Sequence, residues 1–287
     1  MKTSQPAASV RKLLRQFGLK ARKGLGQHFL IDEASLQAVV DAAQLSPEDV
    51  VIEVGPGLGV LTAELARRAG KVIAVELDTK LASLLKHRLA SLSNVDIINA
   101  DILNVSPSQL VEGGNDYKVV ANLPYYITSP ILRHFVEASL KPSLMVVMVQ
   151  REVGEAIVAN PGKMTLLAIS LQVYSKPKIV SYVSAQSFYP SPKVDSVIVR
   201  FELLPEPVVK VADINSFFDV VRCGFSSSRK QLHNSLAQGL GVKPAEVVLL
   251  LDKAGIEPKR RAETLSLEEW ARLYEVLMPS GKDIVSC

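Results

Sequence analysis

The sequence predicts an α/β protein followed by a smaller region that contains only helices. Three observations predict this fold class. Short apolar and β-branched runs alternate with helix-periodic stretches as far as residue 150, a pair of strand patterns follows, and only helical patterns occur from residue 205 onward. A chain of 287 residues is long enough for one large and one small domain.

The composition is that of a globular protein. Hydrophobic residues make up 48% of the chain and charged residues 22%, which excludes a disordered or low-complexity protein. The longest unbroken apolar stretch, 144–149, has six residues, far fewer than the ~20 that a membrane-spanning helix needs. Two cysteines, Cys223 and Cys287, are too few for a disulfide framework or a cysteine-based metal site. We therefore expect a cytoplasmic monomer without membrane contact or metal.

The first 30 residues form a basic segment. They contain seven Lys and Arg and no acid, whereas the rest of the chain sums to a formal charge of −3. Each cation that neutralises a phosphate releases a counterion, so a basic arm on a near-neutral body favours nucleic-acid binding. Val10, Leu13, Leu14 and Phe17 lie at helical spacing, so a targeting peptide and a merely solvated tail are alternatives.

Helix and strand patterns alternate from residue 32 to residue 150. Asp32 and Asp78 each precede apolar residues at helical spacing, so both are predicted helix N-caps. A further helical stretch ends at Gly70. Because helical stretches or loops separate the strands, we expect βαβ units and a parallel sheet covered on both faces. The predicted strands are 50–54, 71–77, 95–101, 117–122 and 144–150.

The pattern changes after residue 150. Segments 178–186 and 196–202 flank the turn-rich segment 188–195, which predicts an antiparallel pair that closes the sheet. Ser266 and Glu269 form a predicted capping box. We divide the chain into a basic arm (1–23), a large domain (24–204) and a small helical domain (205–287). The predicted helices of the small domain are 213–225, 229–238, 244–254 and 266–277.

Three groups at the ends of predicted strands could bind a nucleotide-like cofactor. The first strand enters a glycine-rich turn at Gly55, where backbone can approach a ligand closely. Glu76 ends the second strand, where an acid could accept hydrogen bonds from ribose hydroxyls, and Asp101 ends the third, where it could accept from an adenine amine. Enzymes that use NAD have a similar glycine and acid pair, and each acid could instead be a helix cap.

The fourth strand ends in Asn122, Leu123, Pro124 and Tyr125, a combination suited to amine methylation. An exocyclic base amine is a poor nucleophile because its lone pair is delocalised into the ring. An amide oxygen and a backbone carbonyl that accept its two N–H bonds would favour a pyramidal nitrogen held in line with a methyl donor. Tyr125 would give a flipped base a stacking face. Nothing comparable serves hydride transfer.

Seven motifs together resemble one enzyme family. They are GLGQHFL (24–30), EVGPGLGVLT (53–62), AVELD (74–78), NLPYYITSPIL (122–132), QREV (150–153), FYPSPKVDS (188–196) and GFSSSRKQLHNSL (224–236). These motifs closely resemble the small-subunit ribosomal RNA adenine N6,N6-dimethyltransferases of the KsgA/RsmA type. The resemblance implies a Rossmann-like S-adenosylmethionine-dependent methyltransferase domain with a small C-terminal all-helical domain.

The resemblance also implies roles for individual residues. Asn122, the Leu123 carbonyl, Tyr125 and Phe188 would position the target adenine, with Phe188 stacking on the face opposite Tyr125. S-adenosylmethionine would be bound by His28, Leu30, Gly55, Glu76, Asp101 and Asn122. The RNA phosphates would be bound by Lys20, Arg22, Lys23, Arg222, Arg229 and Lys230.

The implied reaction is dimethylation of two adjacent adenosines in the 3′-terminal hairpin loop of 16S ribosomal RNA in the small subunit, with a role in subunit biogenesis. Two alternatives are a large-subunit methyltransferase of the antibiotic-resistance type and a mainly non-catalytic assembly factor.

The chain departs from the family pattern at two places. His28 replaces the usual asparagine, and Ser228 stands where a second arginine often precedes Arg229.

Overall fold

A computed structural model describes residues 4–18, 21–22, 26–111, 116–227 and 229–278. Its contacts divide the chain into two compact units, one extending to Glu155 and including Ser175–Leu203, the other comprising Ala156–Tyr174 and the chain from Leu204. The contact-based division therefore differs from the predicted one, because segment 156–174 joins the helical unit. The assignment of functions to these parts stays a prediction.

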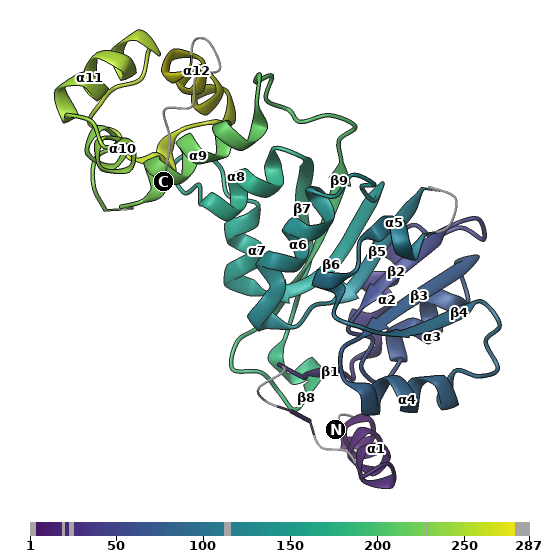
Figure 1. Ribbon diagram of the computed structural model, residues 1–287. Coiled ribbons are helices and arrows are strands. Elements are labelled where there is room, and N and C mark those ends of the chain that lie inside the picture. Colours follow the sequence, from purple (N-terminus) through teal and green to yellow (C-terminus); the bar gives the residue numbers. More distant parts are fainter. Residues whose placement is uncertain (1–3, 19–20, 23–25, 112–115, 228, 279–287) are drawn as a thin grey trace. The chain divides into compact units, whose positions relative to one another are not determined.

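A seven-stranded sheet with the order β4-β3-β2-β5-β6-β9-β7 forms the centre of the first unit (Figure 1). The strands from β4 to β6 are parallel, and β9 is antiparallel to both β6 and β7. The predicted parallel sheet and its closing antiparallel pair are confirmed. The strands are β2 (Val50–Val54), β3 (Lys71–Glu76), β4 (Val95–Asn99), β5 (Tyr117–Asn122), β6 (Leu144–Gln150), β7 (Ser175–Val183) and β9 (Ser196–Leu203).

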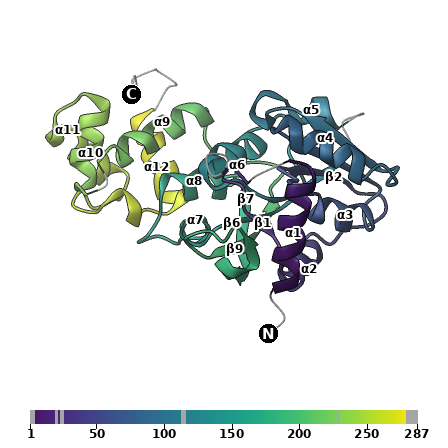
Figure 2. The ribbon, with the colours of Figure 1, turned by 90° about the horizontal axis from the view of Figure 1, so that it is seen from below.

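Helices bury both faces of this sheet. On one face, α2 (Glu33–Ala42) and α3 (Val60–Ala66) pack with strand residues such as Val51 and Val146 (Figure 2). On the other, α7 (Arg151–Ile157) lies so close that a Cβ on Gly154 would meet Val197 and Val199. Burial on both faces accounts for the near-continuous apolar strands of the sequence. The remaining helices of this unit are α4 (Thr79–Arg88), α5 (Pro107–Leu110) and α6 (Thr128–Val136).

Local polar signals begin the helices where the sequence predicts. The Asp32 carboxylate accepts the Ser35 N–H at 2.8 Å and begins α2, and Asp78 accepts the Lys80 N–H at 2.9 Å and begins α4. Each carboxylate satisfies a backbone donor that the first helical turn leaves unpaired. The helical stretch predicted to end at Gly70 is shorter in the structure, where α3 ends at Ala66.

The predicted amphipathic helix near the N-terminus is α1 (Ser4–Gln16), which lies beside α4 in Figure 1. Val10 and Leu14 are buried against Leu58 and Leu81. Phe17 follows the helix and is exposed, so it does not belong to the buried stripe. Because α1 packs against the first unit, its apolar face has a structural role. This packing disfavours the alternative of a merely solvated tail.

A short ladder that the sequence did not predict joins two distant motifs. The two-residue strand β1 (Phe29–Leu30) pairs antiparallel with β8 (Phe188–Tyr189), and the Ile31 N–H donates to the Ser187 carbonyl at 2.8 Å. The ladder places motif 24–30 against loop 188–196, although nearly 160 residues separate them in the sequence. Such short strands carry too little periodicity to be recognised from sequence.

The second unit is helical, as predicted. Its helices are α8 (Leu166–Gln172), α9 (Ile214–Phe225), α10 (Leu232–Leu240), α11 (Pro244–Lys253) and α12 (Leu267–Leu277). The predicted capping box is present at α12, where Glu269 N–H donates to Ser266 Oγ at 3.2 Å and Ser266 N–H donates to the Glu269 carboxylate at 2.8 Å. Helix α10 begins at Leu232, so Arg229 and Lys230 precede it instead of belonging to it.

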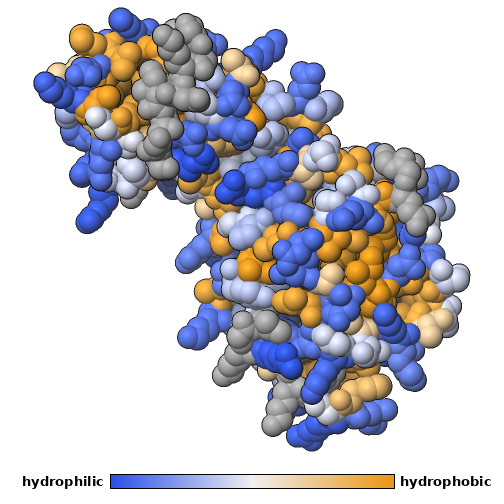
Figure 3. Space-filling model, in the orientation of Figure 1, coloured by the Kyte–Doolittle hydropathy of each residue, from blue (hydrophilic) through white to orange (hydrophobic). Residues whose placement is uncertain are grey.

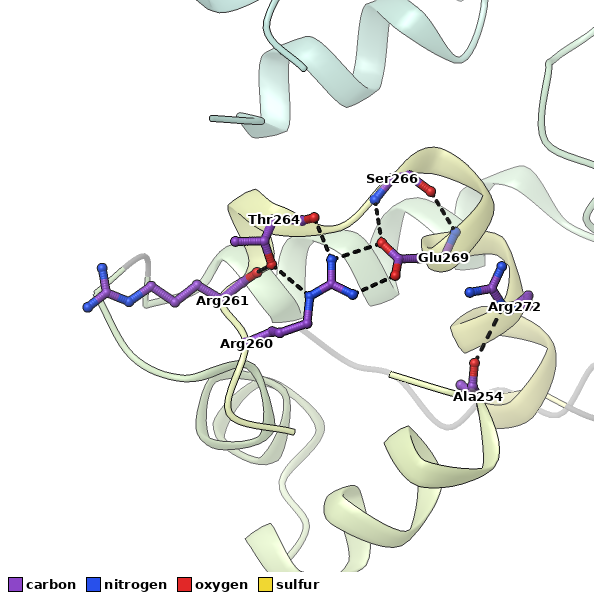
Figure 4. Close-up of polar contacts among 7 residues, drawn as sticks. All are labelled: Ala254, Arg260, Arg261, Thr264, Ser266, Glu269 and Arg272. Carbon is purple, nitrogen blue, oxygen red and sulfur yellow. Dashed lines mark hydrogen bonds and ion pairs between the residues drawn. The ribbon is translucent and has the colours of Figure 1, made fainter. Parts of the chain in front are cut away.

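Arg260 anchors the start of α12 (Figure 4). Its guanidinium donates to both Glu269 oxygens and to the side chain and carbonyl of Thr264. The side chain of the neighbouring Arg261 points away from this network, and its guanidinium lies 4.0 Å from the Glu263 carboxylate. The Arg260 guanidinium lowers the pKa of Glu269, so the capping carboxylate stays ionised.

On the face seen in Figure 3, hydrophilic side chains surround smaller areas of hydrophobic ones on both units. Within the described residues, no helix combines the length and apolar character required to cross a bilayer.

The Arg260 network yields a stability prediction. Arg260→Ala should lower the free energy of unfolding by about 2 kcal/mol, because Glu269 and two Thr264 oxygens lose a charged donor in a half-buried site. Arg261→Ala, the adjacent control, should change it by less than about 0.5 kcal/mol. Chemical denaturation monitored by Trp270 fluorescence measures both, and equal effects would contradict the assignment.

Candidate active site

A cleft of about 1100 Å³ opens where the parallel strands of the first unit end. Gly55 follows β2, Glu76 ends β3, Asp101 follows β4 and Asn122 ends β5, and all four line the cleft. Carboxyl ends of parallel strands meet at one edge of a sheet, which is where α/β proteins bind ligands. His28 and Leu30 also line the cleft, so the structure brings all six predicted cofactor residues together.

The turn after β2 exposes backbone because it consists of glycines with positive φ. Gly55 and Gly57 have φ values of +65° and +58°, a region that other residues rarely adopt. A Cβ on Gly57 would lie 3.2 Å from the Phe29 ring, and one on Gly55 would lie 3.7 Å from Pro124. The turn therefore leaves room for a ligand that side chains would fill.

Glu76 and Asp101 are held by backbone donors. Glu76 is buried, and its two oxygens accept the Gly57 N–H at 3.1 Å and the Asp78 N–H at 2.9 Å. Burial outweighs these bonds and raises the pKa of Glu76. Asp101 accepts the Leu103 N–H at 3.0 Å as the N-cap of a short 3₁₀ helix, so it caps a helix and lines the cleft at once.

Glu53, to which the sequence analysis assigned no role, is the most deeply buried acid of the cleft wall. It lies within β2, and its Oε2 atom finds no hydrogen-bond partner among the described residues. Burial, with a contribution from the nearby Glu76 charge, raises the pKa of Glu53 to about 8. An acid in an otherwise apolar strand pattern, VVIEV, was the signal that could have identified it.

The turn after β5 holds Asn122 and Tyr125 in defined orientations. Asn122 Nδ2 donates to the His28 carbonyl at 3.1 Å, which leaves the amide oxygen Oδ1 available to a ligand. The Tyr125 hydroxyl lies 2.6 Å from Ser196 Oγ, and Thr128 Oγ1 donates to the Pro124 carbonyl at 3.1 Å. Leu123 N–H donates to the Met148 carbonyl at 3.1 Å, which anchors the turn to β6.

Aromatic residues of the site differ in their placement. Tyr125 lines the cleft, and its ring stacks on that of His28. Phe188 does not line the cleft: it is 2% exposed and packs in the core with Leu30 and Ile198. Its predicted position facing Tyr125 across a base is therefore not the one observed, because pairing of β8 with β1 turns the ring into the core. Its role with substrate stays a prediction.

Tyr126 is a cleft residue that the sequence analysis passed over. Its ring is 51% exposed and lines the cleft beside Gly26, at whose position a Cβ would lie 3.4 Å from that ring. Burial, with smaller contributions from the charges of Asp101 and Glu76, raises the pKa of Tyr126. The second tyrosine of the NLPYY motif was the available signal.

Residues 18–278 match the family model described as ribosomal RNA adenine dimethylase. The chain belongs to this family. A relative from Dehalococcoides mccartyi, named ribosomal RNA small subunit methyltransferase A, is 52% identical over 93% of this chain and 91% of its own length. A relative of the same name from Pelotomaculum thermopropionicum is 44% identical over 96% of this chain and 97% of its own length.

Two solved structures share the fold of this dimethylase. The 23S rRNA methyltransferase ErmE is 30% identical with a TM-score of 0.69, and the match covers 87% of this chain and 99% of that one. A dimethyladenosine transferase from Plasmodium falciparum is 26% identical with a TM-score of 0.72, covering 86% and 96%. The predicted Rossmann-like methyltransferase fold with a C-terminal helical region is confirmed.

The dimethylase cleft fits S-adenosylmethionine, the methyl donor of the family. The cofactor is cationic at sulfur and carries hydroxyl and amine donors, and the carboxylates of Glu76 and Asp101 line the cleft. The glycine turn supplies space for close backbone approach. Among the described residues, no group of three or more His, Cys, Asp or Glu could hold a metal ion.

The predicted RNA-binding residues of the dimethylase lie in different surroundings. Lys20 and Lys23 are outside the described residues. Arg22 is exposed and forms a 3.3 Å ion pair with Asp78, whose side chain is buried, and Arg222 pairs with Asp219. Arg229 is exposed, and Lys230 Nζ donates to Gln238 Oε1 at 3.1 Å. The Arg222–Asp219 pair lies at the surface, where an ion pair is weak enough to exchange for phosphate.

The buried acid makes the stability of the dimethylase depend on pH. The folded-state pKa of Glu53 is about 8, against an ordinary value of 4.5, so the folded protein holds a proton that the unfolded chain has lost. The free energy of unfolding should therefore fall as the pH rises through this window, by up to about 1.4 kcal/mol per pH unit. The raised pKa of Glu76 acts in the same direction.

Denaturant unfolding at several pH values between about 5 and 8 measures this dependence. Glu53→Gln, which keeps a neutral side chain of the same shape, should flatten it. Glu48→Gln, a control at an exposed position, should leave it intact. The same pH dependence in the wild type and in Glu53→Gln would show that Glu53 is already ionised in the folded protein.

Proposed function

We propose that this dimethylase transfers methyl groups to the N6 amines of two adjacent adenosines in the 3′-terminal hairpin loop of 16S ribosomal RNA in the small subunit. Relatives named small subunit methyltransferase A support the small-subunit substrate, with up to 52% identity over most of the chain. Such a substrate implies action in the cytoplasm and a role in small-subunit biogenesis. ErmE, a large-subunit enzyme by its name, is only 30% identical and provides the rival substrate.

The turn after β5 is the observation that carries this proposal. Asn122 donates through Nδ2 to the His28 carbonyl, so its Oδ1 is free to accept one N–H of an adenine amine. The Leu123 carbonyl would accept the other N–H. Two acceptors on one amine draw it toward a pyramidal geometry and free its lone pair for attack. The Tyr125 face would hold the flipped base beside them.

The opposite wall of the cleft would bind the cofactor. Glu76 would accept from the ribose hydroxyls and Asp101 from the adenine amine, with the backbone at Gly55 against the remainder. His28, Leu30 and Asn122 would border the reacting end. When bound, S-adenosylmethionine supplies a methyl group that is already activated for transfer. The chain then needs only to orient the amine and exclude water, and the amine proton can pass to solvent.

Transfer of labelled methyl groups is the direct test. The enzyme should label small subunits that lack the modification, with two methyl groups on each of two adjacent adenosines, and should leave large subunits unlabelled. Labelling of large subunits instead would favour the ErmE-like substrate. Binding of small subunits without labelling would favour the assembly-factor alternative.

Asn122→Ala should reduce transfer by at least about a hundredfold, because it removes an acceptor that acts on the reacting amine. Binding of S-adenosylhomocysteine, measured by calorimetry, should remain detectable, and so should binding to small subunits. Asn160→Ala, at an exposed position outside the cleft lining, is the control. Retained turnover in Asn122→Ala would exclude the proposed role.

Charge reversal at Lys20, Arg22 and Lys23 should weaken RNA binding and reduce its salt dependence, since each lost phosphate contact lowers the slope by about one. The matched control reverses Arg67, Arg68 and Lys71, which lie at the amino end of β3, the opposite edge of the sheet from the cleft. Filter binding of the RNA hairpin over a salt series separates the two variants. An unchanged slope in the arm variant would exclude the arm as a phosphate-binding element.

A further inference from the structure

His28 lies where three motifs of the site meet. It directly precedes β1, and its ring stacks on Tyr125 of the NLPY motif, with centroids 5.6 Å apart and ring planes at 24°. Its Nδ1 atom lies 2.6 Å from the carbonyl oxygen of Pro190, in loop 188–196. Both ring contacts are made with residues on the predicted target-base side of the cleft, and neither is made with Glu76 or Asp101.

The contact with Pro190 fixes how the imidazole is oriented. A carbonyl oxygen can only accept a hydrogen bond, so Nδ1 carries the proton and donates to it. The same segment is tied to this loop by the β1–β8 ladder, where Phe29 pairs with Tyr189. The imidazole is thus held to loop 188–196 by its own hydrogen bond, and the backbone that follows His28 pairs with the same loop.

Tyr125 is held at two points, and His28 is one of them. Its hydroxyl lies 2.6 Å from Ser196 Oγ, and the imidazole stacks on its ring in an offset arrangement, with centroids 5.6 Å apart. Because the ring is held both at its hydroxyl and by this stacked contact, its plane is set before substrate arrives, which reduces the ordering that binding must supply.

The backbone carbonyl of His28 orients Asn122, which is the other residue proposed to position the target base. Its carbonyl accepts the Asn122 amide and orients the free Oδ1. A substitution of the side chain leaves this carbonyl in place, so the ring contact with Tyr125 can be removed without removing the acceptor of Asn122. The two effects of the residue are therefore separable by mutation.

We propose that His28 is a positioning residue for the target adenosine, acting by holding the Tyr125 ring and loop 188–196 together. The inference rests on the proposed function and deepens it. An asparagine, the usual residue here among the family motifs that this sequence resembles, could donate to the Pro190 carbonyl but offers no ring to stack on Tyr125. The stacked pair is therefore a feature that this chain owes to its histidine.

The experiment uses the full-length enzyme and an RNA hairpin in which 2-aminopurine replaces one target adenosine. A flipped base that stacks on tyrosine is quenched, whereas one that is flipped without a stacking partner is bright. The variants are His28→Ala, His28→Phe, which keeps a ring, and His28→Asn, which keeps a donor. His87→Ala is the control, because that exposed histidine also lies beside an aromatic ring, Phe17, outside the cleft lining.

His28→Ala should leave 2-aminopurine brighter than the wild type does at saturating protein, and His28→Phe should restore quenching while His28→Asn should not. The transfer rate of His28→Ala on unsubstituted RNA, at saturating cofactor, should fall by about tenfold, the scale of one aromatic contact. Any loss of affinity for S-adenosylhomocysteine, which is expected because His28 also borders the cofactor, does not account for this fall, since the rate is measured at saturating cofactor. In a Tyr125→Ala background, His28→Ala should add little further change in fluorescence, as expected for residues that act through each other.

Equal quenching by the wild type and His28→Ala would overturn this inference alone. A wild-type transfer rate for His28→Ala at saturating cofactor would also overturn it, because the residue would then act through cofactor binding alone. A wild-type enzyme that binds the hairpin without quenching 2-aminopurine would contradict base stacking on Tyr125, and with it both the proposed function and this inference.

Discussion

The parallel pairing of β4, β3, β2 and β5 is the constraint on which the cleft depends. Pairing such as Glu76 with Asn99 and Val50 with Tyr117 brings the carboxyl ends of these strands to one edge. The glycine turn, both acids and Asn122 follow from that arrangement. A one-residue slip of β3 would turn Glu76 to the other face of the sheet. The apolar residues buried on both faces prevent such a slip, so the core positions the chemistry.

The β1–β8 ladder closes the site from the other side. It contains only two residue pairs, yet it places His28 between the NLPY turn and loop 188–196. Tyr125 is in turn bonded to Ser196, which pairs with both Gln150 and Val183 in the main sheet. The Tyr125 side of the cleft is therefore formed by mutual contacts among segments that lie far apart in sequence.

The acids of the cleft illustrate a conflict between stability and function. Burial raises the pKa of both Glu53 and Glu76, the charge of Glu76 adds to the shift at Glu53, and Glu53 Oε2 lacks a partner within the described residues. Such an arrangement destabilises the folded state unless a ligand compensates. A cationic ligand with hydrogen-bond donors would compensate and would stabilise the fold by mass action. Acids of this kind are expected at a binding site and would be costly elsewhere in a core.

Local sequence determined the helix caps at Asp32, Asp78 and Ser266, the parallel strands and the antiparallel pair, because caps and apolar runs act over a few residues. It also predicted six cofactor-binding residues that all line the cleft, since each stands at or near a strand end or in a family motif. Tertiary structure alone decided that Phe188 packs in the core, that Arg22 pairs with Asp78, and that His28 stacks on Tyr125. Each of these contacts joins segments between about 50 and 160 residues apart or depends on such a junction, and no local periodicity encodes which distant segment will be the neighbour.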